Sequence, residues 1–163
     1  MISLRLMEDT LEDYTAMRNW FLEPELQEWV WCDEKGEPPV SLERFIEKYG
    51  ARVKHPTDVF PYFILKDGGP IGFIQYYIQS ETTVGIDMWI GCPKERNNGY
   101  GADALRQMVR LIQERHPEIK ELFIDPEVEN KRAVRCYQNA GFESQGTFID
   151  EEGSACVLLT ICL

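Results

Sequence analysis

The sequence predicts one α+β domain (a mixed α/β arrangement) that spans residues 1–163 and contains one parallel βαβ unit. Two observations support this fold class. Runs of alternating apolar residues, typical of strands, are interspersed with runs whose apolar residues recur every three or four positions, as on one face of a helix. A chain of 163 residues is also long enough for one sizeable core and too short for two ordinary domains.

Capping residues and turn residues delimit the expected elements of the first half. Thr10, followed three positions later by Asp13, and Ser41 are typical helix starts. The sequence Asp-Gly-Gly-Pro at residues 67–70 is a hairpin signal between two alternating runs. The expected elements are, in order, a strand at 2–7, a helix from 11 to about 21, an irregular stretch at 23–39, a helix from 42 to about 53, and strands at 60–66 and 71–79.

A βαβ unit is expected next. Apolar runs at 84–90 and 121–125 flank a segment whose apolar residues recur at helical spacing up to about Arg115. The two strands of such a unit are parallel and its crossover is right-handed. Asn130 then begins a further helix, which Gly141 ends because glycine suits the position just after a helix. The closing strands are expected at 142–149 and 155–162, separated by residues 150–153.

The formal net charge of −11 limits the partners of the chain. Nucleic acids and anionic membrane surfaces would repel such a polyanion, so neither is an expected partner. A cationic partner such as an amine would be attracted. An acidic surface also keeps a protein soluble, and this ordinary explanation accounts for much of the charge.

The cysteines and histidines predict a reduced protein without a metal site. The five cysteines are odd in number and no two of them have C-x-x-C spacing, which argues against both a disulfide framework and a zinc site. His55 and His116 are the only imidazoles, and each precedes a proline. No signal sequence begins the chain, and no apolar run is long enough for a membrane span. We therefore expect a soluble, cytoplasmic protein.

Residues 96–101, with the sequence Arg-Asn-Asn-Gly-Tyr-Gly, join an expected strand to an expected helix. Gly99 and Gly101 allow the backbone to approach a ligand closely, and the start of the helix offers N–H groups and the positive end of its dipole. Arg96 adds a fixed cation. The combination predicts a phosphate site, in particular one for a pyrophosphate, although the same residues also occur in ordinary strand-to-helix turns.

Two motifs occur, in this order, at the joints of the expected elements. They are Arg96-x-x-Gly99-x-Gly101 after a strand, and then Asn130, Ala133 and Tyr137-x-x-x-Gly141-Phe142. With these motifs essentially the whole chain resembles the GNAT superfamily of acetyl-coenzyme A-dependent N-acetyltransferases. The resemblance implies a GNAT fold with a mostly antiparallel central sheet, the parallel βαβ unit at the cofactor site, and acetyl-coenzyme A (acetyl-CoA) as the cosubstrate.

A narrower resemblance rests on acidic residues at two strand ends. The matching segments are Gly85-Ile86-Asp87, Asp125-Pro126 and residues 130–142. They look like the aminoglycoside 6'-N-acetyltransferases, which implies direct acetyl transfer to the 6'-amino group of an aminoglycoside in a ternary complex, and hence antibiotic resistance. The alternatives are a GNAT enzyme for another small amine (a polyamine or an amino sugar) or for a protein N-terminus, and a non-catalytic acyl-coenzyme A sensor. The resemblance implies a monomer or a homodimer.

By this resemblance the cofactor contacts the strand before the turn, the turn itself and the last helix. Backbone N–H groups of residues 98–102 hold the pyrophosphate, and residues 89–91 pair with the pantetheine arm through their backbones, as another strand would. The residues so assigned are Trp89, Ile90, Gly91, Arg96, Asn98, Gly99, Tyr100, Gly101, Ala102, Asn130, Ala133 and Tyr137. The alternative for the apolar side chains of the strand is ordinary core.

Three residues are expected to be catalytic. Tyr137 would protonate the departing thiolate, because a phenol with a pKa of about 10 is close to a thiol of roughly 8.5; the alternative is an aromatic ring packed under the sheet. Asp87 lies inside an apolar strand, where a carboxylate is costly unless something uses it. We expect Asp87 to bind the amine first and to accept its proton second. Asp125 lies where the neighbouring parallel strand ends and where ligands gather in such sheets; the alternative is that it only ends that strand.

Acceptor binding is assigned to Asp87, Asp125, Trp29 and Glu152. An aromatic and acidic stretch suits sugar rings bearing ammonium groups, and its alternative function is to anchor a long loop. That stretch comprises Trp20, Glu25, Glu28, Trp29, Trp31 and Asp33. Glu152 matches an acidic position of the aminoglycoside enzymes, and its alternative is an exposed turn carboxylate. Cys136 is expected to be a small buried apolar residue and not a nucleophile.

Overall fold

The computed structural model of the chain describes residues 1–29 and 41–163. Two compact units are present. Unit 1 comprises Met1–Gln75 and Met88–Arg96, and unit 2 comprises Tyr76–Asp87 and Asn97–Leu163.

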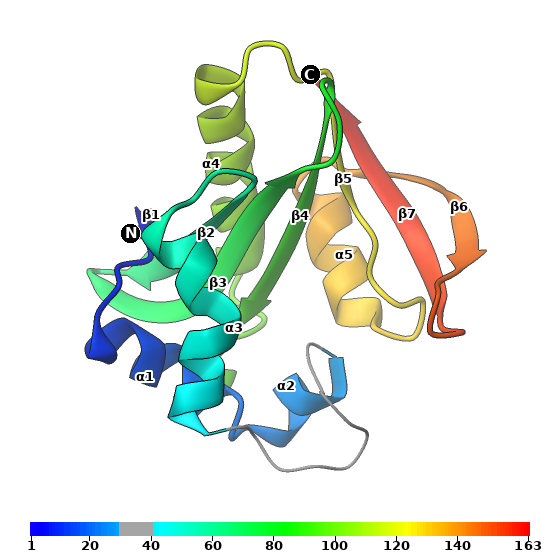
Figure 1. Cartoon of the computed structure of the whole chain (residues 1–163). Coiled ribbons are helices and arrows are strands. Elements are labelled where there is room, and N and C mark those ends of the chain that lie inside the picture. The colour runs from blue at the N-terminus through cyan, green and yellow to red at the C-terminus, as the bar shows by residue number, and fades with distance from the viewer. Residues whose placement is uncertain (30–40) are drawn as a thin grey trace. The chain divides into compact units, whose positions relative to one another are not determined.

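Helices and strands alternate along the chain as a mixed α+β fold requires (Figure 1). The elements are β1 (Ile2–Leu6), α1 (Leu11–Trp20), α2 (Pro24–Trp29), α3 (Leu42–Lys54), β2 (Val59–Lys66), β3 (Gly69–Ile78), β4 (Thr83–Ile90), the 3-10 helix η1 (Pro93–Glu95), α4 (Tyr100–Arg115), β5 (Glu121–Ile124), α5 (Lys131–Asn139), β6 (Glu143–Ile149) and β7 (Ala155–Cys162). Within the described ranges the strands form a seven-stranded sheet in the order β1-β2-β3-β4-β5-β7-β6. β4 and β5 pair in parallel, whereas β1 with β2, β5 with β7 and β6 with β7 pair antiparallel. The predicted fold class is confirmed.

Two predicted helix starts are confirmed, with one difference. The hydroxyl of Thr10 accepts a hydrogen bond from the N–H of Asp13 (3.2 Å), and that of Ser41 accepts one from the N–H of Arg44 (3.3 Å). The carboxylate of Asp13, however, accepts from the N–H of Glu8 (2.8 Å), and the N–H of Thr10 donates to the Glu8 carbonyl. This acid therefore connects the residues after β1 to the start of α1.

The prediction of an irregular stretch at 23–39 is wrong in its first part, because Pro24–Trp29 form a helix. The carboxylate oxygens of Glu23 accept two backbone N–H groups of the first turn, at 3.3 and 3.4 Å. Pro24 occupies the first helical position, where the N–H that proline lacks would have no partner in the helix. The remainder of the predicted stretch lies outside the described residues.

The predicted hairpin between β2 and β3 is confirmed, and its turn is shorter than expected. Asp67 and Gly68 both have positive φ angles (50° and 86°), as two-residue hairpin turns favour. Gly69 and Pro70, which we expect in the loop from the sequence, already belong to β3.

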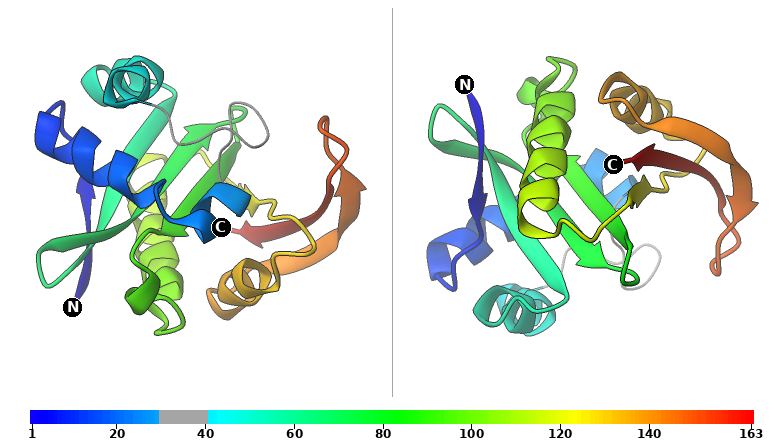
Figure 2. Two further views of the ribbon diagram at one scale, coloured as in Figure 1. Left: turned by 90° about the horizontal axis from the view of Figure 1, so that it is seen from below. Right: turned by 90° about the horizontal axis from the view of Figure 1, so that it is seen from above.

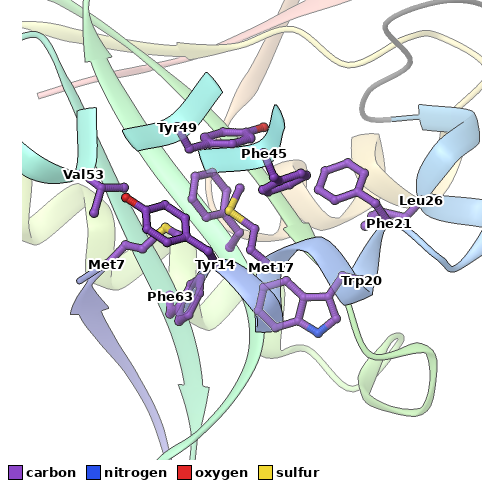
Figure 3. Close-up of a cluster of buried hydrophobic side chains, with 11 residues drawn as sticks. Met7, Tyr14, Met17, Trp20, Phe21, Leu26, Phe45, Tyr49, Val53 and Phe63 are labelled. Atoms are coloured by element: carbon purple, nitrogen blue, oxygen red, sulfur yellow. The ribbon is translucent and has the colours of Figure 1, made fainter. Parts of the chain in front are cut away.

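An aromatic core stabilises unit 1 (Figure 3). Phe45 of α3 lies near both Phe21 and Tyr49, with ring centroids 5.3 and 4.9 Å apart. Trp20 of α1 meets Phe63 of β2 edge-on, with centroids 5.4 Å apart. These rings hold α1 and α3 on the same side of β1 and β2 (Figure 2).

In unit 2, α4 connects β4 to β5, and α5 packs against β7. Figure 2 shows α4 and α5 on the same side of β5 and β7. The predicted apolar face of α4 is buried, since Leu105, Met108 and Ile112 are 0% exposed. Gly141 follows α5 with a φ of 105°, which confirms its predicted function as the residue that ends the helix. No helix in the described part of the chain combines the length and the apolar character that crossing a membrane requires.

Candidate active site

One aspartate of unit 2 lies in β4, and another directly follows the parallel strand β5. Gly85 of β4 is paired with Phe123 of β5, and Asp87 and Asp125 each follow two residues later. Because strand side chains alternate between faces, these four residues share one face. Both aspartates are partly buried. The structure thus brings together two of the residues that the sequence predicts to be catalytic.

The surroundings of the pair raise the pKa of Asp125. Burial is the largest cause, the negative charge of Asp87 adds to it, and Asp150 contributes less. A backbone N–H acts in the opposite direction but does not outweigh them. A carboxylate with a raised pKa accepts a proton more readily than an ordinary one, so this pair suits both the binding of an ammonium group and the removal of its proton.

Tyr77 of β3 joins this group, although we do not single it out from the sequence. A Cβ atom on Gly85 would overlap the Tyr77 ring, so the ring lies directly against that glycine. The ring also meets Phe123 edge-on, with centroids 5.9 Å apart. Burial, followed by the charges of Asp87 and Asp125, raises the pKa of Tyr77. Its hydroxyl is therefore a neutral hydrogen-bond donor in the field of two carboxyl groups.

Tyr137, the predicted acid, is a buried residue of α5 with 7% of its surface exposed. Burial raises its pKa, and the neighbouring Cys136 and the charges of Asp87 and Asp125 raise it further. The phenol is thus protonated at physiological pH, as a proton donor must be. The raised pKa also widens the gap between this phenol and a thiol beyond the small difference that the ordinary values give.

The turn before α4 has the geometry of an anion site. Asn97 and Gly99 have positive φ angles (61° and 82°), and Gly99 caps α4 without a side-chain hydrogen bond. A Cβ atom on Gly99 would meet nothing within 4 Å, so glycine is favoured here by the backbone angle and not by space. The first N–H groups of a helix have no acceptor inside it and lie at the positive end of its dipole. Residues 100–102 supply these groups, of which Gly101 and Ala102 are buried.

The guanidinium of Arg96, the cation expected beside the phosphate site, binds two carboxylates. Its guanidinium donates to Glu25 (2.7 Å), to Glu23 (2.8 Å) and to the carbonyl of Ile90 (3.0 Å). The side chain is only 9% exposed. Two carboxylates compensate the charge, and a contact of Arg96 with the cofactor stays a prediction.

The end of β4 and the residue after it belong to unit 1 and form hydrogen bonds within it. The N–H of Gly91 donates to the carbonyl of Ile71 (2.8 Å), and the Ile90 carbonyl accepts the guanidinium hydrogen bond just described. The ring of Trp89 stacks on Phe73, with centroids 4.5 Å apart, so this side chain belongs to the core. Its buried indole N–H has no hydrogen-bond partner among residues 1–29 and 41–163. Pairing of these backbones with a pantetheine arm stays a prediction, and the Gly91 N–H is not part of it.

Asn130 and Ala133, both predicted cofactor residues, form a helix cap. The Asn130 side chain accepts a hydrogen bond from the N–H of Ala133 (3.3 Å) at the start of α5. This cap fixes the beginning of the helix that holds Tyr137. The pair therefore has a structural function, and its contact with the cofactor stays a prediction.

The two remaining predicted acceptor residues are Trp29 of unit 1 and Glu152 of unit 2. Trp29 is the last residue of α2 and is partly exposed. Glu152 is exposed in the turn between β6 and β7, where its N–H donates to the Asp150 carboxylate (3.0 Å). Their binding of the acceptor stays a prediction.

The aromatic and acidic stretch of the sequence divides into parts with different functions. Trp20 is 8% exposed and lies against Gly91, where a Cβ atom would overlap its indole, so it anchors unit 1 and does not present a surface to a sugar. Glu25 binds Arg96. Trp31 and Asp33 lie outside the described residues.

Cys136 agrees with its expected inertness. Burial raises the pKa of this thiol to about 11, so it is not a thiolate nucleophile at neutral pH. In the described part of the chain, no three His, Cys, Asp or Glu side chains are arranged to hold a metal ion.

Comparisons with known proteins agree with this geometry. Residues 9–149 match the family model of the acetyltransferase (GNAT) domain. Aminoglycoside N(6')-acetyltransferase type 1 of Klebsiella pneumoniae is 32% identical over 166 aligned residues, which cover 94% of the chain and 80% of that protein. The structure of AAC(6')-Ib in complex with ribostamycin and coenzyme A has a TM-score of 0.85 at 28% identity and covers 99% of the chain and 93% of its own. Another, of aminoglycoside acetyltransferase AAC(6')-Ib with coenzyme A and kanamycin, has a TM-score of 0.84 at 28% identity, with coverages of 99% and 95%.

Proposed function

The chain belongs to the GNAT acetyltransferases and, within them, to the aminoglycoside 6'-N-acetyltransferases, and we propose that it transfers an acetyl group from acetyl-CoA to the 6'-amine of an aminoglycoside. Such a transfer would confer resistance to the antibiotic. The observation that most supports this acceptor is the pair Asp87 and Asp125, two partly buried carboxyl groups of which one lies in β4 and the other directly follows the parallel strand β5. A polycationic amino sugar is the kind of ligand that compensates such a pair.

The residues of the α4 turn fit acetyl-CoA. The glycine cap and the N–H groups of residues 100–102 suit its pyrophosphate, because they combine donors with the positive end of a helix of sixteen residues. Asn98 and Gly99 would complete this contact through their backbones. When bound, acetyl-CoA supplies the acyl group as a thioester.

The two aspartates would have different functions toward the amine, one as the proton acceptor and one as the charge that binds it. An amine must lose its proton before it attacks, and an ordinary aspartate with a pKa near 3.9 is a poor base for an ammonium near 10. The raised pKa of Asp125 favours this residue as the proton acceptor, directly or through water. Asp87 then contributes the charge that binds the ammonium group. This refines the sequence-based expectation, in which Asp87 has both functions.

Tyr137 would donate to the sulfur atom as the thiolate departs. Its raised pKa makes a hydrogen bond to the forming thiolate the first contribution of the phenol, with transfer of the proton following as negative charge grows on sulfur. Tyr77, the second neutral phenol in the group, would orient the carboxyl groups or an acceptor hydroxyl.

Release of free thiol from acetyl-CoA tests this function directly. We expect thiol release to rise with kanamycin-like acceptors that have a 6'-amine and to stay at background with 6'-hydroxyl analogues. Spermine and a peptide amine serve as competing acceptors, and faster turnover of either one would contradict the aminoglycoside assignment. A single domain over residues 1–163, a cytoplasmic location and a monomeric or homodimeric state remain predictions.

A further inference from the structure

Arg96 of unit 1 is bound to both carboxylates and backbone carbonyls. Its guanidinium donates to both Glu23 and Glu25 and to two backbone carbonyls, those of Ile90 (3.0 Å) and Gly91 (3.5 Å). The side chain is 9% exposed, whereas those of Glu23 and Glu25 are 25% and 37% exposed. One cation thus compensates two carboxylates, and without it these two acids would repel each other.

The partners of Arg96 form the beginning of α2. Glu23 accepts the N–H groups of Glu25 (3.4 Å) and Leu26 (3.3 Å), so the residue that Arg96 binds is also the residue that caps the helix. A helix of six residues is not stable by itself. Besides the ion pairs, α2 is held by its buried Leu26 and by the Gln27 side chain, which donates to the carbonyl of Phe21 (2.6 Å).

We infer that Arg96 is a positioning residue for the acceptor and not a ligand of the cofactor phosphates: by binding Glu23 and Glu25 it holds α2, and with it Trp29, a residue predicted to bind the acceptor. The inference rests on the proposed function in so far as Trp29 contacts an aminoglycoside.

The test is the effect of Arg96→Gln on each substrate separately. We expect the acceptor KM to rise about tenfold, because the two acids repel and α2 loosens, while kcat and the Kd of coenzyme A change by less than about twofold. Arg96→Lys keeps the charge but lacks the planar guanidinium that can bind two carboxylates at once. Its acceptor KM should therefore lie between those of Arg96→Gln and the wild type. Arg106→Gln is the matched control, because Arg106 is an exposed arginine of unit 2 that is paired with Asp103 and not with the acids of α2. Its acceptor KM, kcat and Kd for coenzyme A should equal those of the wild type.

A phosphate ligand would give the opposite pattern. If Arg96→Gln raises the Kd of coenzyme A about tenfold, more strongly at low salt, and leaves the acceptor KM unchanged, the inference is overturned. Should Arg96→Gln not fold, Glu25→Gln removes the more exposed partner alone and must still raise the acceptor KM, by about threefold, for the inference to stand.

Amide hydrogen exchange makes the inference independent of the acceptor. Exchange of the α2 amides should quicken at least about tenfold in Arg96→Gln and not in Arg106→Gln. If the wild type acetylates no aminoglycoside, the proposed function fails while this measurement still decides whether Arg96 holds α2. Unchanged exchange in α2 would overturn the inference even if aminoglycosides are acetylated.

Discussion

Each unit of the molecule contains a partly or fully buried aspartate, and the pKa values of the two shift in opposite directions. Asp13 of unit 1 is 5% exposed and accepts two hydrogen bonds from Arg5, both at 2.9 Å. Burial acts to raise its pKa, but the Arg5 hydrogen bonds, the Glu8 N–H and the Arg5 charge outweigh burial and lower it. Asp125 of unit 2 faces another carboxyl instead, and burial and that charge together raise its pKa.

The difference distinguishes Asp13, which stabilises the fold, from Asp125, which we propose to take part in catalysis. A carboxylate paired with arginine stabilises the native state and has little tendency to take up a proton. Two neighbouring carboxyl groups repel each other and destabilise the native state. Such an arrangement is typical of sites where a cationic ligand or a proton compensates the negative charge. Four substitutions or conditions test this contrast.

Asp125→Asn should have the largest effect, and on catalysis alone. The change removes both a charge that attracts the amine and the better proton acceptor, so kcat/KM for the acceptor should fall about 10³-fold in steady-state kinetics. Because repulsion with Asp87 is relieved, the free energy of unfolding should stay the same or increase. A defect confined to coenzyme A binding would contradict the placement of Asp125.

Asp13→Asn should have the next largest effect, and on stability alone. The change removes the charge that pairs with Arg5 and one of the two oxygens that accept from Arg5 and from the Glu8 N–H, so urea unfolding should give a free energy lower by about 3 kcal/mol. The kcat of the folded fraction should not change. A fall in kcat with stability intact would place Asp13 with the catalytic acids and remove the contrast.

Tyr137→Phe should lower kcat by about 30-fold with little change in the affinity for coenzyme A. Its matched control is Tyr14→Phe, since Tyr14 is also a buried tyrosine whose pKa is raised, in this case by burial and by its hydrogen bond to Asp9 (2.8 Å). Tyr14→Phe should leave kcat as it is. Equal turnover in the wild type and Tyr137→Phe would exclude the acid function.

The pH dependence of unfolding should show the smallest effect, with opposite signs for the two aspartates. The lowered pKa of Asp13 contributes stability that is present above its unfolded pKa and is lost as the pH falls through the folded value. The raised pKa of Asp125 means that the native state holds this proton more tightly, so stability decreases as the pH rises from the unfolded to the folded value. Subtracting the curves of Asp13→Asn and Asp125→Asn from the wild-type curve should therefore give differences of opposite slope. Equal slopes would contradict the contrast.

The elements that the sequence predicts well are those with local signals. Thr10, Ser41 and Gly141 mark helix ends through their own chemistry, and the pair Asp67 and Gly68 marks a turn. The helix α2 is missed because six residues are too few to show a helical period, and its cap at Glu23 resembles any loop acid. Local pattern therefore accounts for most of the fold.

The contacts of the candidate site are harder to predict from the sequence, because they join residues that are far apart in the chain. The partners of Arg96 lie 71 and 73 positions earlier in the chain, and no local pattern links them. Apart from Gln75, the strand run that contains Tyr77 is apolar or aromatic on both faces, so no local pattern distinguishes Tyr77 from core. A signal was available in Gly85, since a glycine inside an apolar strand indicates that something packs closely against the backbone.

The contact between Gly85 and Tyr77 also restricts the order in which the enzyme can acquire substitutions. Any side chain at position 85 meets the Tyr77 ring, so it is tolerated only after a smaller residue has replaced the tyrosine. If position 85 changes first, the variant with a side chain at position 85 and Tyr77 still present is overpacked. Lineages that adapt to a different acceptor should therefore change position 77 first, and the two positions should covary across relatives as a large and a small partner.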